Sequence, residues 1–545
     1  MPQLFARTCK LTLALLLATA VVSIAQQPSA PVVGVADYQR AEKFLAPNTA
    51  PLVYHAVRPA WLADGRFWYR DNGADQVQFL VVDPTHLQNP APLFDHARLA
   101  QALSEAMGGR KFDFKHLPFQ TLELSDDGQT LSFSLGPRQV TCDLRTYVCK
   151  SSNPTEAEMR GGEGVGPAGP NRRNEVLSPD KKQAAFIRDW NLWVKDVASG
   201  KETQLTKDGV KDYGYATHNA GWIRTDAPIL MWSPDSKKIA TFQQDQRKDG
   251  EMYVVESKVG HPVLQQWKYP LPGDKDVTMI ERVVIDVPSA KIARFKMPPD
   301  QHRSTLCDDI ACRGTQWTDV EWSPDSKQVA FVSTSRDHKD EHLRVASAES
   351  GDVRDVLEEK VATQYESGNG KANNYVLFGS NEVIWFSERS NWGHLYLYDL
   401  KTGQLKNQIT SGDWNVTQVL KVDEKNRVIY FLGVGKQPGL DPYYSQLYRI
   451  GFDGKGLQLL TPETMNHEVE LSDKGPYFID TYSTPTTPQV TVLRDLDGKV
   501  LATIAKADIS KLVAGGWVPP VPITVKARDG QTDLYGLMFK PTNFD

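Results

Sequence analysis

The sequence lacks the short motifs that mark common hydrolytic active sites. Gly-x-Ser-x-Gly, the turn that presents the nucleophilic serine of α/β-hydrolases, does not occur in the 545 residues. The zinc-peptidase motif His-Glu-x-x-His does not occur either. A net charge of −5 gives no indication of a nucleic-acid partner. The residues by themselves therefore indicate neither a catalytic centre nor a cofactor.

Cysteine is scarce, with five in the chain. Cys9 lies in the N-terminal targeting segment, and the other four form two close pairs, Cys142 with Cys149 and Cys307 with Cys312. An even number of cysteines in an exported chain favours disulfides, and the first pair could face each other across one hairpin. A zinc site is the alternative, but neither pair has the Cys-x-x-Cys spacing that such sites use.

The N-terminus has the features of a signal peptide. Arg7 and Lys10 precede an apolar run from Leu11 to Ile24, which is too short to span a membrane comfortably. Ser23-Ile24-Ala25 has the small-x-small pattern of a cleavage site. We therefore expect residues 1–25 to be a signal peptide and the protein to be periplasmic or secreted. A retained N-terminal anchor helix is the alternative.

What the chain does contain is a repeat. Met231 to Phe242 (MWSPDSKKIATF) returns almost letter for letter as Glu321 to Val332 (EWSPDSKQVAFV). In both copies Ser-Pro-Asp-Ser has the chemistry of a turn, because proline presets φ and because serine and aspartate bond nearby backbone groups. The flanking apolar runs alternate or are β-branched, so each copy predicts a strand, a turn and a second strand.

Weaker copies of this hairpin occur along the whole chain. They include Trp61, Leu124, Leu177, Phe378, Val422 and Leu471, which with the two clear copies makes eight starts. Most copies are followed by a second hairpin with an Asp/Gly turn, clearest in Asn191 to Lys201 and His394 to Gln404. Two hairpins per repeat give four antiparallel strands. The sequence therefore predicts an all-β fold, an eight-bladed β-propeller of four-stranded blades.

The repeats divide the chain into segments. Residues 26–56 form a proline- and alanine-rich N-terminal arm, and residues 57–515 form the propeller, with a long insertion at 248–316. Residues 516–545 contain a proline-rich linker and two predicted strands around Arg528-Asp529-Gly530. Between the second and third repeats, Gly164-x-Gly166-x-x-Gly169 matches a dinucleotide-binding pattern, but its prolines and its linker context predict a loop.

Two histidines have the spacing of metal ligands. His338 and His342 are four residues apart, which on a helix would bring both to one metal. They lie, however, in a charged stretch between two predicted strands, where a solvated hairpin loop is expected. No other histidines or carboxylates converge visibly, so we predict no metal site.

The repeats and several further segments together resemble the dipeptidyl peptidase IV-like serine peptidases of the prolyl oligopeptidase clan. The segments are WSPDSKKIA, NLWVKDVASGKETQLT (191–206), WKYPLPGDKD (267–276), SERSNWGHLYLYDLKTG (387–403) and ITSGDWNV (409–416). The resemblance covers residues 170–545 well and 35–170 loosely. It implies an eight-bladed propeller over a C-terminal α/β-hydrolase domain, between which a peptide is cut after a penultimate proline or alanine. Ile523 to Asp545 resemble the first hydrolase strands, so the domain begun at 516 would be truncated here.

The resemblance also implies site residues. The family's oxyanion-hole tyrosine and its Ser-Asp-His triad would lie beyond Asp545, so no catalytic residue is assigned and we expect no peptidase activity from these residues alone. Family members hold the substrate's N-terminal ammonium with paired glutamates, but the matching stretch, His218 to Asp226, has none. Asp226 is the substrate-binding candidate there, although it could be a turn residue before Pro228. Alternatively, the parent enzyme is not a strict aminopeptidase.

Arg138 is the second substrate-binding candidate. It corresponds best to the family's second-blade arginine, which binds the substrate carbonyl, although a plain surface arginine is equally compatible with the sequence. The expected partners are a peptide substrate and the hydrolase domain, with a homodimer possible and no nucleic acid. The alternative function is a stand-alone periplasmic scaffold similar to TolB-type propellers. Residues 523–545 argue against it, because a scaffold has no use for two strands that belong to no blade.

Overall fold

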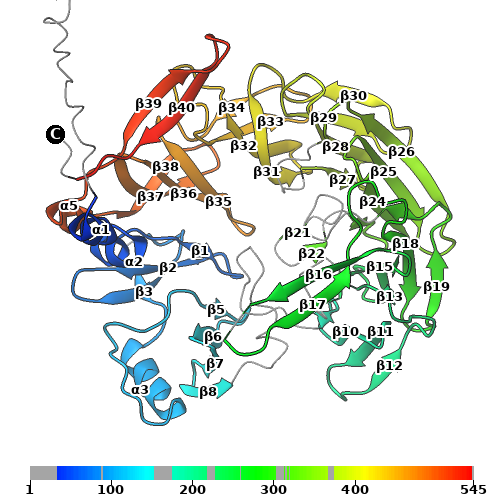
Figure 1. Cartoon of the computed structure of the whole chain (residues 1–545), viewed down its shortest axis with the longest axis horizontal. Coiled ribbons are helices and arrows are strands. Elements are labelled where there is room, and N and C mark those ends of the chain that lie inside the picture. The colour runs from blue at the N-terminus through cyan, green and yellow to red at the C-terminus, as the bar shows by residue number, and fades with distance from the viewer. Residues whose placement is uncertain are drawn as a thin grey trace, which may run out of the picture.

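The computed structural model describes residues 33–87, 90–152, 175–217, 228–257, 259–301, 312–313, 316–317, 320–365 and 373–542. Eight antiparallel sheets in this part of the chain are arranged around a central axis as the blades of a propeller (Figure 1). The predicted all-β, eight-bladed architecture is therefore confirmed. None of the helices in these ranges is long and apolar enough to cross a membrane.

Seven blades have four strands in chain order, with the fourth strand at the outer rim (Figure 1). Blade 1 contains β1 (Ala60–Trp61), β2 (Phe67–Asn72), β3 (Val77–Val82) and β4 (Ala91–Pro92). Blade 2 contains β5 (Glu123–Leu124), β6 (Thr130–Leu135), β7 (Arg138–Asp143) and β8 (Val148–Ser152). Blade 3 contains β9 (Val176–Leu177), β10 (Gln183–Arg188), β11 (Asn191–Asp196) and β12 (Glu202–Gln204).

Blades 5 to 8 complete the ring. Blade 5 contains β23 (Val320–Trp322), β24 (Gln328–Thr334), β25 (Asp340–Ser347) and β26 (Val353–Lys360). Blade 6 contains β27 (Tyr375–Leu377), β28 (Glu382–Ser387), β29 (His394–Asp399) and β30 (Leu405–Gln408). Blade 7 contains β31 (Asn415–Asp423), β32 (Val428–Val434), β33 (Gln446–Gly451) and β34 (Gln458–Leu459). Blade 8 contains β35 (Asn466–Leu471), β36 (Tyr477–Thr484), β37 (Thr487–Asp495) and β38 (Val500–Lys506).

Blade 4 departs from the four-stranded prediction, because it has six strands. They are β13 (Tyr213–Tyr215), β14 (Met231–Trp232), β15 (Lys238–Asp245), β18 (Met279–Asp286), β19 (Lys291–Arg294) and β20 (Asp300–Gln301). Two short strands, β13 and β14, pair with opposite ends of β15, and β19 and β20 pair with opposite ends of β18. The four-strand plan thus persists, with its first and last strands each divided in two.

The remaining elements lie outside the blades. The helices are α1 (Val35–Glu42), α2 (Ala46–Thr49), η1 (Ala50–Leu52), α3 (His96–Ala106) and α5 (Ser510–Ala514). The two-stranded sheets are β16 (Glu251–Glu256) with β17 (Val263–Lys268), β21 (Cys312–Arg313) with β22 (Gln316–Trp317), and β39 (Val521–Lys526) with β40 (Asp533–Met538). Asp95 caps α3, since its carboxylate accepts hydrogen bonds from the backbone N–H groups of Ala97 and Arg98.

The Ser-Pro-Asp-Ser turns form as the sequence predicts. In blade 4 the backbone N–H of Ser233 donates to the Lys238 carbonyl over 2.8 Å, and the Asp235 carboxylate accepts from the hydroxyl of Ser233 and the N–H of Lys237. Ser236 has a positive φ of 60°. Blade 5 repeats this network at Ser323, so the repeated letters encode one repeated turn.

The tryptophan before each clear turn ties its blade to the preceding one. The Trp232 indole donates to the Val176 carbonyl of blade 3 over 3.0 Å, and the Trp322 indole donates to the Met231 carbonyl of blade 4 over 3.2 Å. Trp61 makes the same bond across the ring closure, to the Glu470 carbonyl of blade 8 over 3.1 Å. These bonds fix the spacing of neighbouring blades around the axis.

The ring closes between its first and last blades without a shared strand. The backbone of Tyr54 exchanges two hydrogen bonds with that of Asp508, over 2.9 and 2.8 Å. An apolar cluster fills the junction and draws on blade 1 and blade 8; its buried members are Val57, Phe67, Tyr69, Val82, Ile479 and Leu493. Burial of this apolar surface stabilises the closed ring.

The Asp/Gly turns give a matched test of blade packing. A Cβ on Gly403 would lie 1.8 Å from the Val356 carbonyl oxygen of blade 5, whereas a Cβ on Gly200, in the equivalent turn of blade 3, would meet nothing within 4 Å. Both have a positive φ, so Gly200→Ala should cost about 1–2 kcal/mol. Gly403→Ala should cost about 1–3 kcal/mol more. Thermal unfolding would test this, and equal losses would contradict it.

Glu382 gives a second test, based on pH. It is almost fully buried between Arg427 of blade 7 and Lys406. Burial alone would raise the pKa of Glu382, but hydrogen bonds from Arg427 and Lys406 outweigh it and lower the pKa from 4.5 to about 2. Because the folded carboxyl binds its proton more weakly than the unfolded one, this contribution is present above pH 4.5 and is lost as the pH falls toward 2.

Glu382→Gln should therefore remove on the order of 3 kcal/mol of stability at pH 7 and only about 1 kcal/mol at pH 3, where the unfolded carboxyl is already protonated. Denaturant unfolding between pH 7 and pH 3 would measure both values. The exposed Glu424→Gln in the neighbouring turn is the control and should change little. A loss that is the same at every pH would contradict the assignment.

Candidate substrate-facing surface

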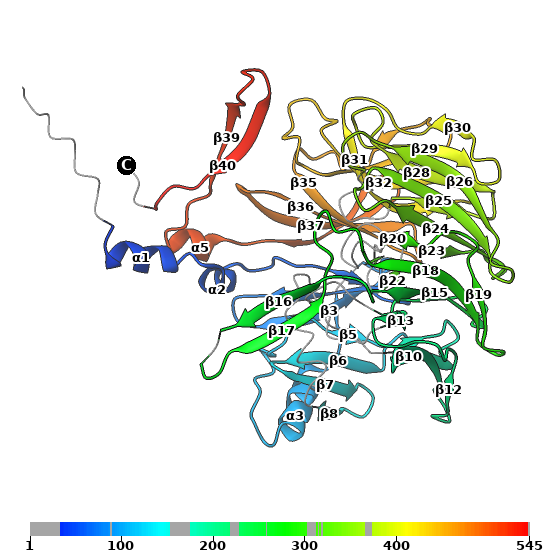
Figure 2. The ribbon, with the colours of Figure 1, turned by 45° about the vertical axis from the view of Figure 1, so that its right-hand side comes forward.

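One face of the ring carries both projecting hairpins. β16 and β17 are inserted between β15 and β18, where the second strand of a blade ends. All second strands of a propeller run in the same direction, so the loops that follow them lie on this same face. The fourth strand of an antiparallel blade runs the same way, and β39 and β40 follow β38 on the same side (Figure 2). We call this surface the hairpin face.

Arg138 lies on the hairpin face. It follows the turn Gly136-Pro137 after β6 and is the first residue of β7, where it pairs with Leu135. Its side chain is exposed, and its Nη1 lies 4.0 Å from the sulfur of Met107. No ion pair within the described residues involves Arg138, so its charge is available to a ligand on this face.

Three other predicted site residues cannot be placed. Asp226 and the stretch 218–227 lie outside the described residues, as do Cys307 and the side chain of Cys312. Asp212, a more distant carboxylate, has a positive φ of 62°, and its carbonyl accepts a hydrogen bond from the N–H of Gln246. Cys142 and Cys149 form a disulfide across β7 and β8, with their Cα atoms 4.0 Å apart.

A buried polar cluster, which the sequence reasoning missed, joins blades 5 and 6. Glu359, near the end of β26, accepts hydrogen bonds from the Trp385 indole over 2.8 Å, from Arg389 over 2.9 Å and from the Ser387 hydroxyl. Arg389 also donates to the Tyr398 hydroxyl over 2.6 Å. Because both oxygens of Glu359 accept hydrogen bonds from these side chains, the cluster fixes the loop after β28. Ser387 and Arg389 belong to the SERSNWG segment, which is the one sequence signal for this cluster.

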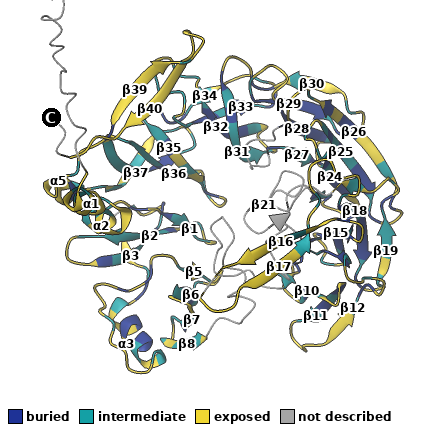
Figure 3. Cartoon of the chain, in the orientation of Figure 1, coloured by how far each residue is buried: buried dark blue, intermediate teal, exposed yellow. Residues whose placement is uncertain are grey.

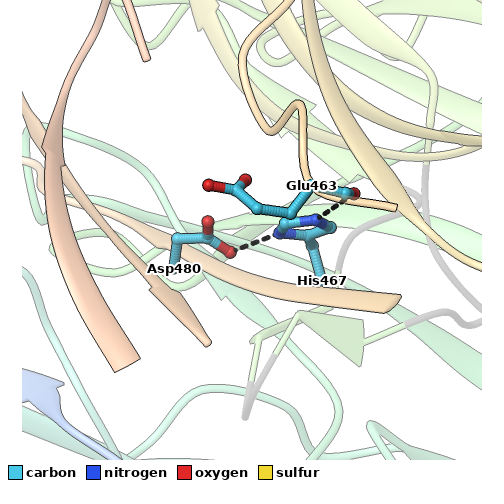
Figure 4. A group of neighbouring side chains, drawn as sticks. All are labelled: Glu463, His467 and Asp480. Carbon is cyan, nitrogen blue, oxygen red and sulfur yellow. Dashed lines mark hydrogen bonds and ion pairs between the residues drawn. The ribbon is translucent and has the colours of Figure 1, made fainter. Parts of the chain in front are cut away.

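A second buried cluster has the composition of a metal site. It consists of an imidazole, that of His467, and the carboxylates of Glu463 and Asp480, whose potential ligand atoms lie within 4.8 Å of one another. It is the one such group among the residues that the structure describes. His467 Nδ1 lies 2.8 Å from an Asp480 oxygen, and its Nε2 lies 3.1 Å from the Glu463 carbonyl oxygen (Figure 4). Both ring nitrogens therefore face oxygen atoms.

Arg494 decides what this cluster can do. Its Nε donates to the second oxygen of Asp480 over 2.8 Å, and its Nη2 donates to Glu463 over 2.7 Å. The guanidinium is 2% exposed and binds one oxygen of each carboxylate, so a cation already lies where a metal ion would need to bind. A zinc or similar ion also needs a free imidazole lone pair, which these contacts do not leave. The cluster fits a buried ionic network, not a metal centre.

The histidine pair noted in the sequence does not form a site either. His342 lies on β25, with Nε2 3.4 Å from a Glu358 oxygen and Nδ1 3.8 Å from an Asp355 oxygen. His338 has a positive φ of 57° in the turn before β25. In this hairpin the two residues are not on a helix, and neither belongs to a group of three metal ligands in the described chain.

Comparison with known proteins identifies the family. The model of the dipeptidyl peptidase IV (DPP IV) N-terminal region matches residues 145–489, more than half of the chain. The chain belongs to this family. Among curated proteins, dipeptidyl peptidase 4 of Trichophyton rubrum is 24% identical over 355 residues, which are 61% of this chain and 42% of that protein. Dipeptidyl peptidase 4 of Arthroderma otae is 25% identical over 337 residues, with coverages of 57% and 40%.

Solved structures show the same fold. Dipeptidyl peptidase 4 of Porphyromonas gingivalis superposes with a TM-score of 0.62 at 20% identity and covers 90% of this chain and 65% of that one. The chain thus spans about two fifths of the first curated DPP IV relatives and about two thirds of this solved structure. The family-model match, residues 145–489, begins within blade 2 and ends within blade 8.

The ionic network of blade 8 can be tested by one substitution. Asp480→Asn leaves Arg494 and His467 buried without their anion, which should cost about 3–5 kcal/mol. Asp473→Asn, in an exposed turn of the same blade, is the matched control and should change little. Thermal unfolding would measure both variants.

Zinc binding tests the assignment of the cluster as an ionic network. Titration of wild-type protein and His467→Gln with zinc should give the same binding isotherm, because no metal is held there. Loss of one zinc equivalent in His467→Gln would instead make the cluster a metal centre.

Proposed function

We propose that this chain is the substrate-gating and substrate-anchoring propeller of an exported serine peptidase that releases Xaa-Pro or Xaa-Ala dipeptides from peptide N-termini. The observation that carries the proposal is the family match over residues 145–489, together with a C-terminal hairpin that belongs to no blade. The relatives that share this region are dipeptidyl peptidases by name.

The C-terminal hairpin supports a further domain. Every residue of β39 and β40 is exposed (Figure 3), including Ile523, Leu534 and Leu537. An isolated two-stranded hairpin is marginal in water, so its apolar residues call for further strands. An α/β-hydrolase domain built on this hairpin would lie over the hairpin face, and it would supply the Ser-Asp-His triad that the residues up to Asp545 do not provide. By themselves these residues would be inactive.

The hairpin face supports a role in substrate anchoring. A domain over this face would enclose a peptide between itself and the ring, where Arg138 offers an exposed cation for a peptide carbonyl. Asp226 would be the anion for the N-terminal ammonium. With one candidate carboxylate in place of two glutamates, we expect a weaker preference for a free N-terminus.

Two further features fit this proposal. The Cys142–Cys149 disulfide suits an oxidising compartment, in line with the signal peptide expected at residues 1–25.

The β16–β17 hairpin exposes Tyr253, Val255 and Leu264, which share one of its faces. Such an apolar projecting surface suits contact with a second copy of the protein.

The first test is the coding sequence downstream of Asp545. A continuing frame with Gly-x-Ser-x-Gly, then Asp and then His, is the expected result, and purified full-length protein should hydrolyse Gly-Pro-p-nitroanilide while residues 26–545 should not. A stop codon, or a full-length protein without this activity, would overturn the peptidase proposal and favour a binding scaffold.

Arg138→Ala tests the anchoring residue in the full-length enzyme. It should lower kcat/KM for the Xaa-Pro substrate about tenfold or more, because a charge-assisted hydrogen bond contributes about 1.5–3 kcal/mol. Arg145→Ala, an exposed arginine elsewhere on the same blade, is the control and should leave kcat/KM unchanged. Equal effects of the two replacements would make Arg138 a surface residue.

A further inference from the structure

Neighbouring blades share an apolar cluster at seven of the eight blade interfaces. Within the described residues, separate clusters join blades 1 and 2, 3 and 4, 4 and 5, 5 and 6, 6 and 7, 7 and 8, and 8 and 1. No cluster in these residues draws on both blade 2 and blade 3. We call the interface between these two blades the 2/3 seam. Residues 153–174, which connect the two blades, lie outside the described residues.

Blade 2 presents a polar surface to the 2/3 seam. Leu131, Phe133 and Val140 point to the cluster shared with blade 1. Because side chains alternate along a strand, the opposite face carries the residues between them, which form the cross-strand pairs Thr130–Asp143, Ser132–Thr141 and Ser134–Gln139. None of these six residues is buried. Blade 4, by contrast, is apolar on both faces, with Ile239 in one cluster and Phe242 in the next.

Blade 3 covers its side of the 2/3 seam with its own residues. Phe186 and Trp193 stack with ring centroids 6.4 Å apart, and the Arg188 guanidinium lies over both rings, at 5.1 and 4.9 Å. The ion pair that spans the seam, Lys181 with Asp126, is 69% and 74% exposed. Exposed ion pairs contribute little to stability.

Two hydrogen-bonding ties that the blade 3–blade 4 and blade 4–blade 5 interfaces have are missing from the 2/3 seam. Where blades 4 and 5 have Trp232 and Trp322, whose indoles bond the preceding blade, blade 3 has Leu177, which is 38% exposed. In blades 4 and 5 the last serine of the turn, Ser236 or Ser326, accepts a hydrogen bond over 3.2 Å from a backbone N–H in the equivalent turn of the preceding blade. Blade 3 has Lys181 at this position. An ammonium group cannot accept a hydrogen bond.

We propose that the propeller ring opens at the 2/3 seam, and not at the junction of blades 1 and 8 where the ring is not covalently continuous. That junction has an apolar cluster, the Trp61 bond and the paired backbones of Tyr54 and Asp508. Separation of blades 2 and 3 would open a passage from the outside of the ring to its central axis, where β5 and β9, the first strands of the two blades, lie. The proposal concerns the ring alone and does not depend on peptidase activity.

Spin-label distances across the two interfaces test the proposal. Exposed turn residues carry the labels, as Gln129→Cys with Lys182→Cys across the 2/3 seam and Ala63→Cys with Asp473→Cys across the blade 1–blade 8 junction. Cys9, Cys307 and Cys312 are replaced by serine in both proteins. Pulsed electron spin resonance should show a second, longer-distance population for the seam pair and one population for the junction pair. One population for both pairs, or a longer one at the junction, would overturn the proposal.

Restoring the repeat should close the 2/3 seam. Leu177→Trp with Lys181→Ser returns both hydrogen-bonding groups, and should reduce the longer population roughly fivefold or more, since one hydrogen bond contributes about 1 kcal/mol. Leu177→Phe with Lys181→Arg adds similar bulk and keeps the charge but restores neither bond, so it is the matched control and should leave that population within about twofold. Equal effects of the two pairs of substitutions would contradict the role of these ties.

Discussion

The fold depends on one constraint, that a blade buried between two others must have an apolar surface on both faces. A blade with only one apolar face would place a polar face against the next blade, where it could not pack on an apolar surface. Blade 6 shows the solution, because every residue of β28 is buried, with Ile384 and Phe386 in the cluster shared with blade 7 and Val383 and Trp385 in the cluster shared with blade 5. The clusters alternate with blades around the ring, so each blade is held by its neighbours more than by its own strands.

Three carboxylates buried in this stack are each paired with an arginine. Glu359 with Arg389, Glu382 with Arg427, and Asp480 with Arg494 each place a carboxylate against a guanidinium in or next to a blade interface. Unpaired, any of these charges would be costly to bury. The pairs give the ring geometric specificity that apolar packing does not supply, because a guanidinium and a carboxylate bind in defined orientations.

The hairpin face and the 2/3 seam are the two places where this packing is incomplete, and they differ in kind. The exposed apolar residues of β39 and β40 suit a permanent partner, which the proposed hydrolase domain would be. The blade 2 side of the seam carries hydroxyl and amide groups that water can satisfy, so it needs no partner. A surface of this type can separate and close again at little cost in free energy, which an apolar interface cannot do.

The sequence by itself determined the number of blades, because the first hairpin of each repeat is a local structure; the hydrogen bonds of the Ser-Pro-Asp-Ser turn in blade 4 lie within about six residues. It also predicted the hairpin turns and the segment after the last blade. The division of the first and last strands of blade 4 was not predictable, because it depends on which ends of β15 and β18 find partners.

Only the tertiary structure decided how distant residues meet. Glu463 and Arg494 lie 31 positions apart, with His467 and Asp480 between them, and nothing in this spacing distinguishes an ionic network from a metal centre until the guanidinium is placed. Likewise, Leu177 and Lys181 look like ordinary variation in a repeat. The loss of two hydrogen bonds at these positions becomes visible only in the folded ring, where both residues lie next to blade 2. Contacts between blades join residues that local sequence patterns do not relate.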